Sequence, residues 1–590
     1  MQSQASAQRS DAFSRQGGRD GASTSRPTPL LRSGDTCWRV ERAERVALIV
    51  DGADYFAHLR EALIRARRTV YLVGWDFDLR IEMLPGRSDA HGNAPDGLPN
   101  RLGAFLRAIV ERNDRLELFI LKWDGAMVME IAQQVLPTLE LKRTDRVHFA
   151  LDSHHPVGAT HHQKVVVVDD RLAFCGGIDV TTGRWDTHEH RENDERRRAP
   201  DGDIEKPWHD VTTALEGPIA TALGDLARER WRKACGERLE PPTVPESPWP
   251  EGLSADLAGV DVAIARTEPP YHAQERVDEI KRLYLAAINA ARSILYVESQ
   301  YLASGELCEA MEARLREADG PEILVVNPQE AEGTLAHALM DGARAIMIER
   351  LRAAAREGAR ARGGRERFAI YYPVNASRAP IYVHAKVVIM DDRLVRVGSS
   401  NVNNRSMGFD TECDIAFEAT TDVQGTVARE FRLRLLAEHL GVEAEAIGRE
   451  WRARGSLIDA VEALRSEQGR GLVPIRAEPM LPPERAAAEA ALFDPDHWQR
   501  NRVRPLKAVS HAAKRAMSPY HVEAVGALTL LLGAGAIVGG AWAGRALARG
   551  ARERRARRHA PERGFPAIVT STGRTRPSLS SSGTRTGHDV

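Results

Sequence analysis

Two copies of one short motif in this 590-residue chain combine residue types that can act on a phosphate group. Each copy reads His-x-Lys, four apolar residues and Asp, and the copies begin at His162 and His384. An imidazole can attack phosphorus or transfer a proton, and an ammonium group can bind a phosphate oxygen. A chance match has a probability on the order of 10⁻⁴ per position from ordinary residue usage, so two copies indicate one shared site.

The geometry of a β-strand predicts which side chains of each motif share a face. Successive side chains alternate between faces, so the His and the Lys point to one side and the closing Asp to the other. We therefore expect the His and the Lys to form an oxyanion site and the Asp to support the local structure. These residues are His162, Lys164 and Asp169 in the first motif, and His384, Lys386 and Asp391 in the second.

A second similarity along the chain has nearly the same offset as the two motifs. RTVYLV at residues 68–73 resembles RSILYV at residues 292–297, an offset of 292 − 68 = 224, and the two histidines give 384 − 162 = 222. A period this long does not suit a solenoid. It predicts one α/β unit that is duplicated, with a Pro-rich linker at residues 240–259 and an active site between the copies.

Hydrophobic periodicity predicts the elements that position the first motif. Residues 54–67 suit an amphipathic helix, and β-branched or apolar runs suit buried strands at residues 70–73, 116–121, 147–151 and 165–168. This alternation predicts an α/β fold with two pseudo-symmetric lobes, each a mixed sheet flanked by helices. The predicted divisions are a disordered tail at 1–36, lobes at 37–239 and 260–470 around the linker, a connecting segment at 471–523, a candidate transmembrane helix at 524–544, and a basic, disordered tail at 545–590.

Composition limits the classes of function. Lys and Arg total 82 against 83 for Asp and Glu, a net charge of −1, which removes the bulk cationic field of a general nucleic-acid binder. Five cysteines lie far apart without a Cys-x-x-Cys pair, so neither a disulfide framework nor a zinc module is indicated. This usage favours a reducing compartment.

The C-terminal region suggests contact with a membrane. Residues 524–544 carry no charge, and their 21 positions at about 1.5 Å each just span a bilayer. Six glycines in the segment leave a buried helix or hairpin as the alternative. The arginines that follow favour a cytoplasmic tail, but no signal precedes the lobes, so the side of the membrane stays open. We expect a membrane-associated protein.

The segments around the motifs carry a family resemblance. They read GGIDVTTGRWDT at 176–187, PWHD at 207–210, LEGP at 215–218, ESQY at 298–301, NVNNRSM at 401–407 and DTE at 410–412. Over roughly residues 40 to 450, the chain resembles the phospholipase D superfamily, whose signature is the duplicated HKD motif. It is most similar to the eukaryotic-type branch.

The resemblance implies roles for individual residues in a reaction without metal or other cofactor. One histidine forms a covalent phosphohistidine while the other serves as acid and base; His162 is assigned as nucleophile and His384 as acid/base, with the order left open by pseudo-symmetry. The implied catalytic set is His162, Lys164, Asp169, His384, Lys386, Asp391 and Glu412. Asn401 and Asp179 are the implied substrate-binding residues, although a carboxylate at Asp179 would repel a phosphate.

The same resemblance suggests roles for further side chains near the motifs. Glu412 is implied to orient a histidine, and Asp186 is its expected counterpart in the first lobe. Trp185 and Trp208 are expected to be core aromatics.

The resemblance implies a phospholipase D. Such an enzyme hydrolyses the distal phosphodiester of a glycerophospholipid, such as phosphatidylcholine, to phosphatidic acid and a free head-group alcohol. The alternatives are a transphosphatidylase of the cardiolipin synthase type, an HKD-family nuclease and a catalytically silent membrane scaffold. The expected partners are a phospholipid substrate and a membrane surface, with no nucleic acid, and the expected state is a monomer with an intramolecular two-lobe site.

Overall fold

The computed structural model describes residues 28–125, 144–331, 340–477 and 485. The predicted transmembrane helix at 524–544 and the basic tail lie outside the described residues. Among the helices that are described, none is both long and apolar enough to cross a bilayer.

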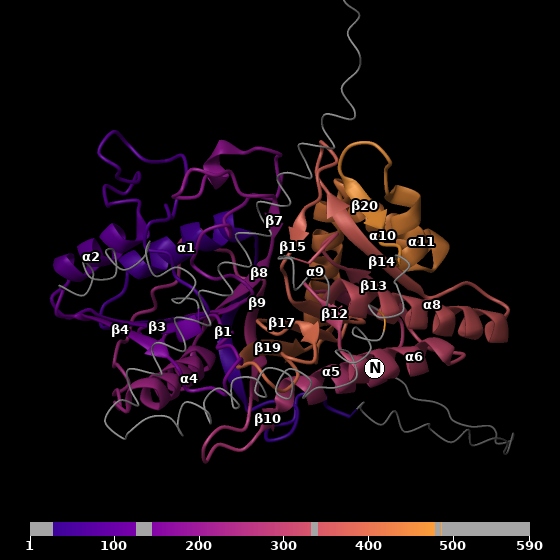
Figure 1. Cartoon of the computed structure of the whole chain (residues 1–590), viewed down its shortest axis with the longest axis horizontal. Helices are drawn as coiled ribbons and strands as arrows, with labels where there is room; N and C mark the ends of the chain where they lie inside the picture. The colour runs from indigo at the N-terminus through magenta and orange to yellow at the C-terminus, as the bar shows by residue number, and fades with distance from the viewer. Residues whose placement is uncertain (1–27, 126–143, 332–339, 478–484, 486–590) are drawn as a thin grey trace, which may run out of the picture. The chain divides into compact units, whose positions relative to one another are not determined.

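The first lobe alternates strands and helices, as the sequence predicts (Figure 1). Its predicted helix and its four predicted strands are all present, with ends shifted by up to three residues. The elements are β1 (Arg39–Val50), α1 (Gly52–Ile64), β2 (Thr69–Gly74), α2 (Leu102–Arg112), β3 (Glu117–Trp123), β4 (Val147–Asp152), β5 (Val165–Val168), β6 (Leu172–Gly176), β7 (Trp208–His209), β8 (Val211–Glu216) and α4 (Pro218–Cys235).

The second lobe repeats most of this order and adds further elements. The repeated elements are β9 (Leu257–Glu268), α5 (Glu279–Ala290), β11 (Ile294–Glu298), α6 (Gly305–Arg316), β13 (Glu322–Val326), β14 (Phe368–Val374), β16 (Val387–Met390), β17 (Leu394–Gly398), β19 (Glu412–Glu418) and α9 (Asp422–Leu440). The added elements are β10 (Val277–Asp278), β12 (Leu302–Ala303), α8 (Gly342–Arg362), β15 (Tyr382–Val383), β18 (Val402–Asn403), α10 (Ala444–Arg454), α11 (Leu457–Leu464) and β20 (Gly471–Pro474).

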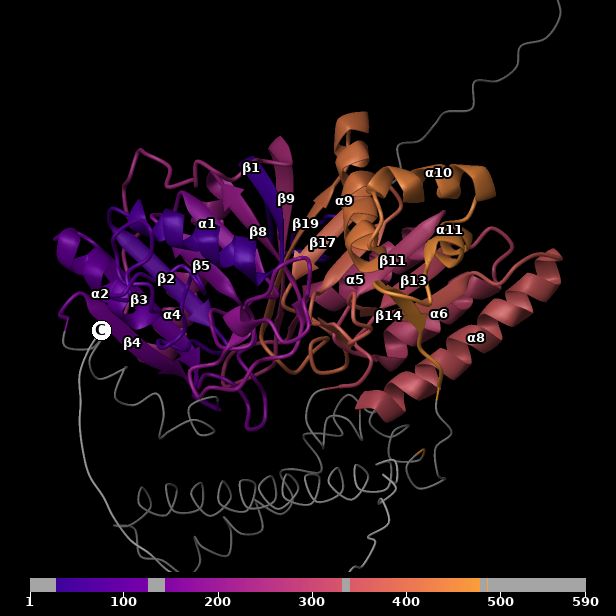
Figure 2. The same ribbon diagram turned by 90° about the horizontal axis from the view of Figure 1, so that it is seen from above.

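The main sheets of the two lobes join into one mixed sheet. From the centre outwards, the first lobe runs β1-β8-β6-β5-β2-β3-β4 and the second runs β9-β19-β17-β16-β11-β13-β14. Antiparallel pairing of β1 with β9 joins the halves, which lie side by side in Figure 2. The α/β prediction is thus confirmed, and the two halves of the sheet have matching strand orders, but the sheet is continuous where two sheets were expected.

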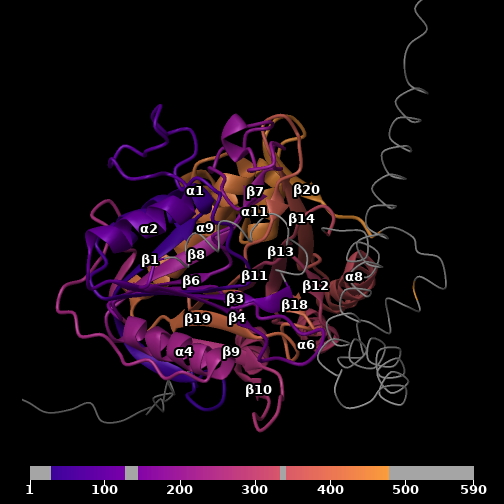
Figure 3. The ribbon, with the colours of Figure 1, turned by 60° about the vertical axis from the view of Figure 1, so that its left-hand side comes forward.

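Helices cover both faces of the sheet in the first lobe. Figure 3 shows α1 and α2 on one face and α4 on the other. Side chains of α4 and α9 share one apolar core with the central strands, including Leu223 and Leu435. This shared core continues across both lobes, so it holds the two motifs in a fixed relation.

Three predicted boundaries differ from the structure. Residues 28–36 do not belong to a disordered tail: Leu30 is buried, and its N–H donates to Glu418. The predicted linker at 240–259 already contains the start of β9, and β20 extends the second lobe past residue 470 by pairing with β14. Each of these segments adds a strand or an anchoring contact that depends on pairing with a distant part of the chain, which local sequence does not reveal.

Candidate functional site

Each motif is held by the backbone of the opposite lobe. The N–H of His162 donates to the carbonyl oxygen of Thr411 at 2.8 Å, and the N–H of His384 donates to that of His209 at 2.8 Å. Parallel pairing of β7 with β15 continues the second of these contacts. The two histidines therefore lie at the junction of the lobes, where the sequence predicted an active site.

The residue after each of these carbonyls orients the histidine. Nδ1 of His162 lies 2.9 Å from Oε2 of Glu412, and Nδ1 of His384 lies 2.7 Å from Oδ2 of Asp210. A carboxylate acceptor at Nδ1 places the proton there and leaves the lone pair on Nε2. Each imidazole is thus oriented by a carboxylate of the opposite lobe.

The expectation for Asp186 is wrong. Its carboxylate accepts from Nδ1 of His190 at 2.9 Å, from Arg197 and from the N–H of Trp208, and it contacts neither motif histidine. The orienting carboxylate is Asp210, which lies within the PWHD segment at 207–210. Sequence spacing within one lobe could not find it, because the contact is made between the lobes.

Glu412 is braced as well as buried. Oγ of Ser399 donates to its Oε2 at 2.5 Å and Oγ of Ser406 donates to its Oε1 at 2.7 Å. Burial raises the pKa of Glu412 to about 7, although both serines oppose the rise. The two serines fix the carboxylate that holds His162.

The two lysines have different surroundings. Nζ of Lys164 lies 3.0 Å from Oδ2 of Asp179, whose Oδ1 accepts from the N–H of Trp75 at 3.0 Å. Nζ of each lysine donates to the carbonyl oxygen of its own motif histidine, so the ion pair with Asp179 is what distinguishes Lys164. The position that corresponds to Asp179 is Asn401, whose buried Oδ1 has no hydrogen-bond partner among the described residues.

The two closing aspartates of the motifs lie away from the histidines, and their carboxylates are occupied. Asp169 accepts from the N–H groups of residues 67, 68 and 69 at 2.7–2.9 Å, and Asp391 accepts from those of residues 292, 293 and 294 at 2.8–3.0 Å. Each follows the strand whose other end carries the His and the Lys. Their inclusion in a catalytic set is therefore corrected: they hold the start of the neighbouring strand.

Burial and nearby cations keep both imidazoles neutral. Burial lowers the pKa of His162 well below its usual value, and the charges of Lys164 and Lys386 lower it further. Burial, Lys386 and Arg184 act in the same way on the pKa of His384. Burial also lowers the pKa of Lys386 to about 7. Two neutral imidazoles with available Nε2 lone pairs suit nucleophilic and general-base chemistry.

A second cluster of histidines and carboxylates lies next to Asp210. Nδ1 of His209 is 2.9 Å from Oε1 of Glu438, and its Nε2 is 3.0 Å from Oε2 of Glu298. Burial opposes protonation of His190, but the carboxylates around it, with Asp51 foremost, raise its pKa to about 9. The full cluster is Asp51, His190, His209, Glu298, Glu438 and His439. Its residue types could hold a divalent cation, but hydrogen bonds from imidazole to carboxylate already account for the short contacts.

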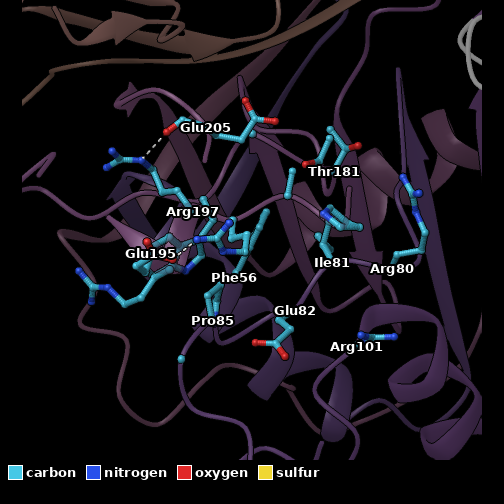
Figure 4. A pocket seen from close by; sticks show the side chains of 18 of the residues that line it. Phe56, Arg80, Ile81, Glu82, Pro85, Arg101, Thr181, Glu195, Arg197 and Glu205 are labelled. Carbon is cyan, nitrogen blue, oxygen red and sulfur yellow. Dashed lines mark hydrogen bonds and ion pairs between the residues drawn. The ribbon is translucent and has the colours of Figure 1, made fainter. Parts of the chain in front are cut away.

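A separate pocket of about 560 Å³ lies in the first lobe (Figure 4). Its lining includes Phe56 of α1, Thr181, Arg197 and Glu205. No residue of either motif lines it, so this pocket is not the site at the lobe junction.

Comparisons with known proteins agree with the motifs. A family model described as phospholipase D matches residues 62–244 and 359–452. Phospholipase D alpha 1 of Vigna unguiculata is 25% identical over 67% of this chain and 65% of its own length. Phospholipase D alpha 1 of Carica papaya is 26% identical over 65% of this chain and 63% of its own. The chain thus spans less than two thirds of these relatives.

One solved structure that the chain matches is a phosphatidylserine synthase from Haemophilus influenzae Rd KW20. It has a TM-score of 0.46 and 12% identity, and the match covers 72% of this chain and 96% of that one.

Proposed function

Because this chain belongs to the phospholipase D superfamily, we propose that it hydrolyses the distal phosphodiester of a glycerophospholipid to phosphatidic acid and a head-group alcohol. The observation that carries the proposal is the pair of imidazoles at the lobe junction, each oriented by a carboxylate of the opposite lobe. Two histidines with matched support suit a reaction that needs a nucleophile and a proton carrier.

In the first step, Nε2 of His162 attacks phosphorus. The bond from phosphorus to the head-group oxygen breaks, and protonated His384 gives its proton to that oxygen. The negative charge of the bound phosphodiester offsets the lysine charges that lower the pKa of His384 in the free enzyme. The products of this step are a phosphohistidine and the free alcohol.

In the second step, neutral His384 removes a proton from water. The hydroxide oxygen bonds to phosphorus, the P–N bond breaks, and phosphatidic acid leaves His162. The proton that His384 takes from water replaces the one that it gave to the alcohol in the first step. The reverse assignment of the two histidines has the same atom balance, because the lobes are pseudo-symmetric.

The lysines and the amide would hold the phosphoryl oxygens. The buried Oδ1 of Asn401 has no hydrogen-bond partner among the described residues, and we assign the Nδ2 of this amide, together with Lys386, to the phosphoryl oxygens. We assign Asp179 to positioning Lys164, because its two oxygens are already engaged. This replaces its expected role in substrate binding.

Transphosphatidylation is the second candidate, since the same phosphohistidine can react with an alcohol in place of water. A product assay on phosphatidylcholine and phosphatidylglycerol vesicles, with and without added glycerol, separates the two reactions. We expect phosphatidic acid as the main product. Phosphatidylglycerol or cardiolipin as the main product would support a synthase of the cardiolipin type.

Nuclease activity is the third candidate, and the near-zero net charge argues against it. Cleavage of single-stranded DNA in the absence of any lipid turnover would overturn the proposal.

Association with the membrane surface through residues 524–544 belongs to the same proposal. Vesicle co-sedimentation of the full chain and of a chain ending at residue 518 tests it.

A further inference from the structure

Two aromatic rings lie beside the histidine that would protonate the leaving group. Trp208 of β7 and Tyr382 of β15 stack with their ring centroids 4.8 Å apart. The ring of Trp208 also lies 4.9 Å from that of His384. The head-group oxygen leaves phosphorus toward the acid, so this aromatic pair flanks the place where the head group lies.

Cationic side chains lie over both rings. The guanidinium carbon of Arg184 is 4.2 Å from the ring centroid of Trp208. Nζ of Lys206 is 3.8 Å from the centroid of Tyr382 and 5.7 Å from that of Trp208. The face of an aromatic ring attracts a cation. Here Arg184 already occupies a face of Trp208, and Lys206 already occupies a face of Tyr382.

The backbone at Arg184 is fixed. A Cβ on Gly52, at the start of α1, would come within 2.1 Å of the carbonyl oxygen of Arg184, so only glycine permits this approach. Nε of Arg184 is buried and has no hydrogen-bond partner among the described residues. A buried N–H without an acceptor favours a ligand that brings an oxygen to it.

Charge at this position reaches the reacting groups. Arg184 is close enough to lower the pKa of His384 and of Lys386. A quaternary ammonium placed beside His384 would meet the same repulsion, and it would find the aromatic faces covered. A hydroxyl-bearing head group would instead accept hydrogen bonds from the guanidinium.

Building on the proposed function, we propose that Arg184 and Lys206 form a head-group subsite that selects an uncharged, hydroxyl-bearing head group over choline. Phosphatidylglycerol is then a better substrate than phosphatidylcholine, the example that the sequence suggested. Lys206 sets the charge at the outer edge of the subsite, and Arg184 donates to the hydroxyl oxygens.

The test uses the full chain on vesicles that contain equal amounts of phosphatidylglycerol and phosphatidylcholine. Glycerol and choline released from the same vesicles are measured together, so their ratio does not depend on vesicle binding or on the amount of active enzyme. We expect glycerol to exceed choline about tenfold.

Variants that change the charge of Lys206 test whether the subsite sets the ratio of glycerol to choline released. Lys206→Glu should shift it toward choline by about tenfold, and the milder Lys206→Gln should shift it in the same direction by less. Arg107→Glu is the matched control, because it makes the same charge change at an exposed position of α2 and should leave the ratio unchanged.

Choline release equal to or above that of glycerol, or an unchanged ratio in both Lys206 variants, would overturn the subsite and leave the phospholipase proposal in place. Release of neither head group would overturn the proposed function, and the subsite with it.

Discussion

The two halves of the site share a backbone frame and differ in charge. Each motif histidine donates its backbone N–H to a carbonyl oxygen of the other lobe. Its Nδ1–H donates to the carboxylate of the residue that follows that carbonyl, Glu412 or Asp210. Yet Lys164 is paired with the carboxylate of Asp179, whereas the equivalent position in the second lobe is the uncharged Asn401. Duplication thus preserved the positioning contacts, while substitution made the charge of the two halves unequal.

The unequal charge gives the halves different tasks. A phosphodiester anion is repelled by Asp179 and is not repelled by Asn401, so we expect it to lie nearer Lys386 of the second lobe.

The carboxylates that orient the histidines also differ. Glu412 is held by two serine hydroxyls, and Asp210 accepts from the N–H of Val211 at 2.8 Å.

The largest expected effect comes from removing a carboxylate that orients the histidine of the opposite lobe. Asp210→Asn should lower kcat by about 10³-fold or more, because an amide no longer stabilises the imidazolium that forms during proton transfer. Asp186→Asn is the matched control and should keep activity per folded molecule within about threefold, since Asp186 contacts neither motif histidine. Steady-state kinetics, with the folded fraction from circular dichroism, checks both variants.

The reverse result for this pair is also defined. Full activity in Asp210→Asn, with loss of activity in a folded Asp186→Asn, would restore the assignment that spacing alone suggested.

Exchanging the charge between the halves should have the next largest effect. Asn401→Asp places a carboxylate toward the phosphate and should lower kcat/KM by about 10- to 100-fold. Asp179→Asn should lower it by less than about tenfold, because Lys164 keeps its charge and its contact with the carbonyl of His162. If Asp179→Asn proves the more damaging change, the phosphate lies nearer the first lobe.

The pH dependence should report one group from each half. Glu412, with its pKa raised to about 7, becomes protonated as the pH falls and then holds His162 less well. Lys386, with its pKa lowered to about 7, loses its charge as the pH rises and then binds phosphate less well. The profile of kcat/KM should be bell-shaped around pH 7, with each limb changing about tenfold per pH unit.

Two controls sharpen this profile. Lys386→Arg should flatten the alkaline limb, because a guanidinium keeps its charge. The alkaline limb of the kcat profile should lie at higher pH than that of the kcat/KM profile, since a bound anion favours the charged lysine and so raises its pKa. A profile that is flat from pH 5 to 9 would contradict both assignments.

The smallest effect on catalysis is expected from the aspartates that close the motifs. Asp169→Ala and Asp391→Ala each leave three backbone N–H groups without their acceptor, which should lower the free energy of unfolding by about 1–3 kcal/mol. The loss should be larger for Asp169, because that side chain is buried. Denaturant unfolding measures it, and a large loss of activity in folded protein would return these residues to the catalytic set.

The sequence predicted most of the repeated unit because its signals are local. Strand β5 and helix α1 follow from apolar periodicity, and the alternation of side chains along β5 separated Lys164 from Asp169. Asp210 was missed because its contact with His384 joins residues 174 positions apart in different lobes. Leu30 was missed because its anchor, Glu418, lies on a strand of the second lobe.

Chemical trapping of the intermediate tests the central claim most directly. A phospholipid with a p-nitrophenol head group needs little help from an acid, so the His384→Asn variant should still form the phosphohistidine but hydrolyse it slowly. We predict one equivalent of p-nitrophenol in a burst and, by mass spectrometry, a phosphatidyl adduct on His162, with neither in His162→Asn. An adduct on His384 in the His162→Asn variant would reverse the assigned roles. The absence of an adduct from both variants would contradict the covalent mechanism.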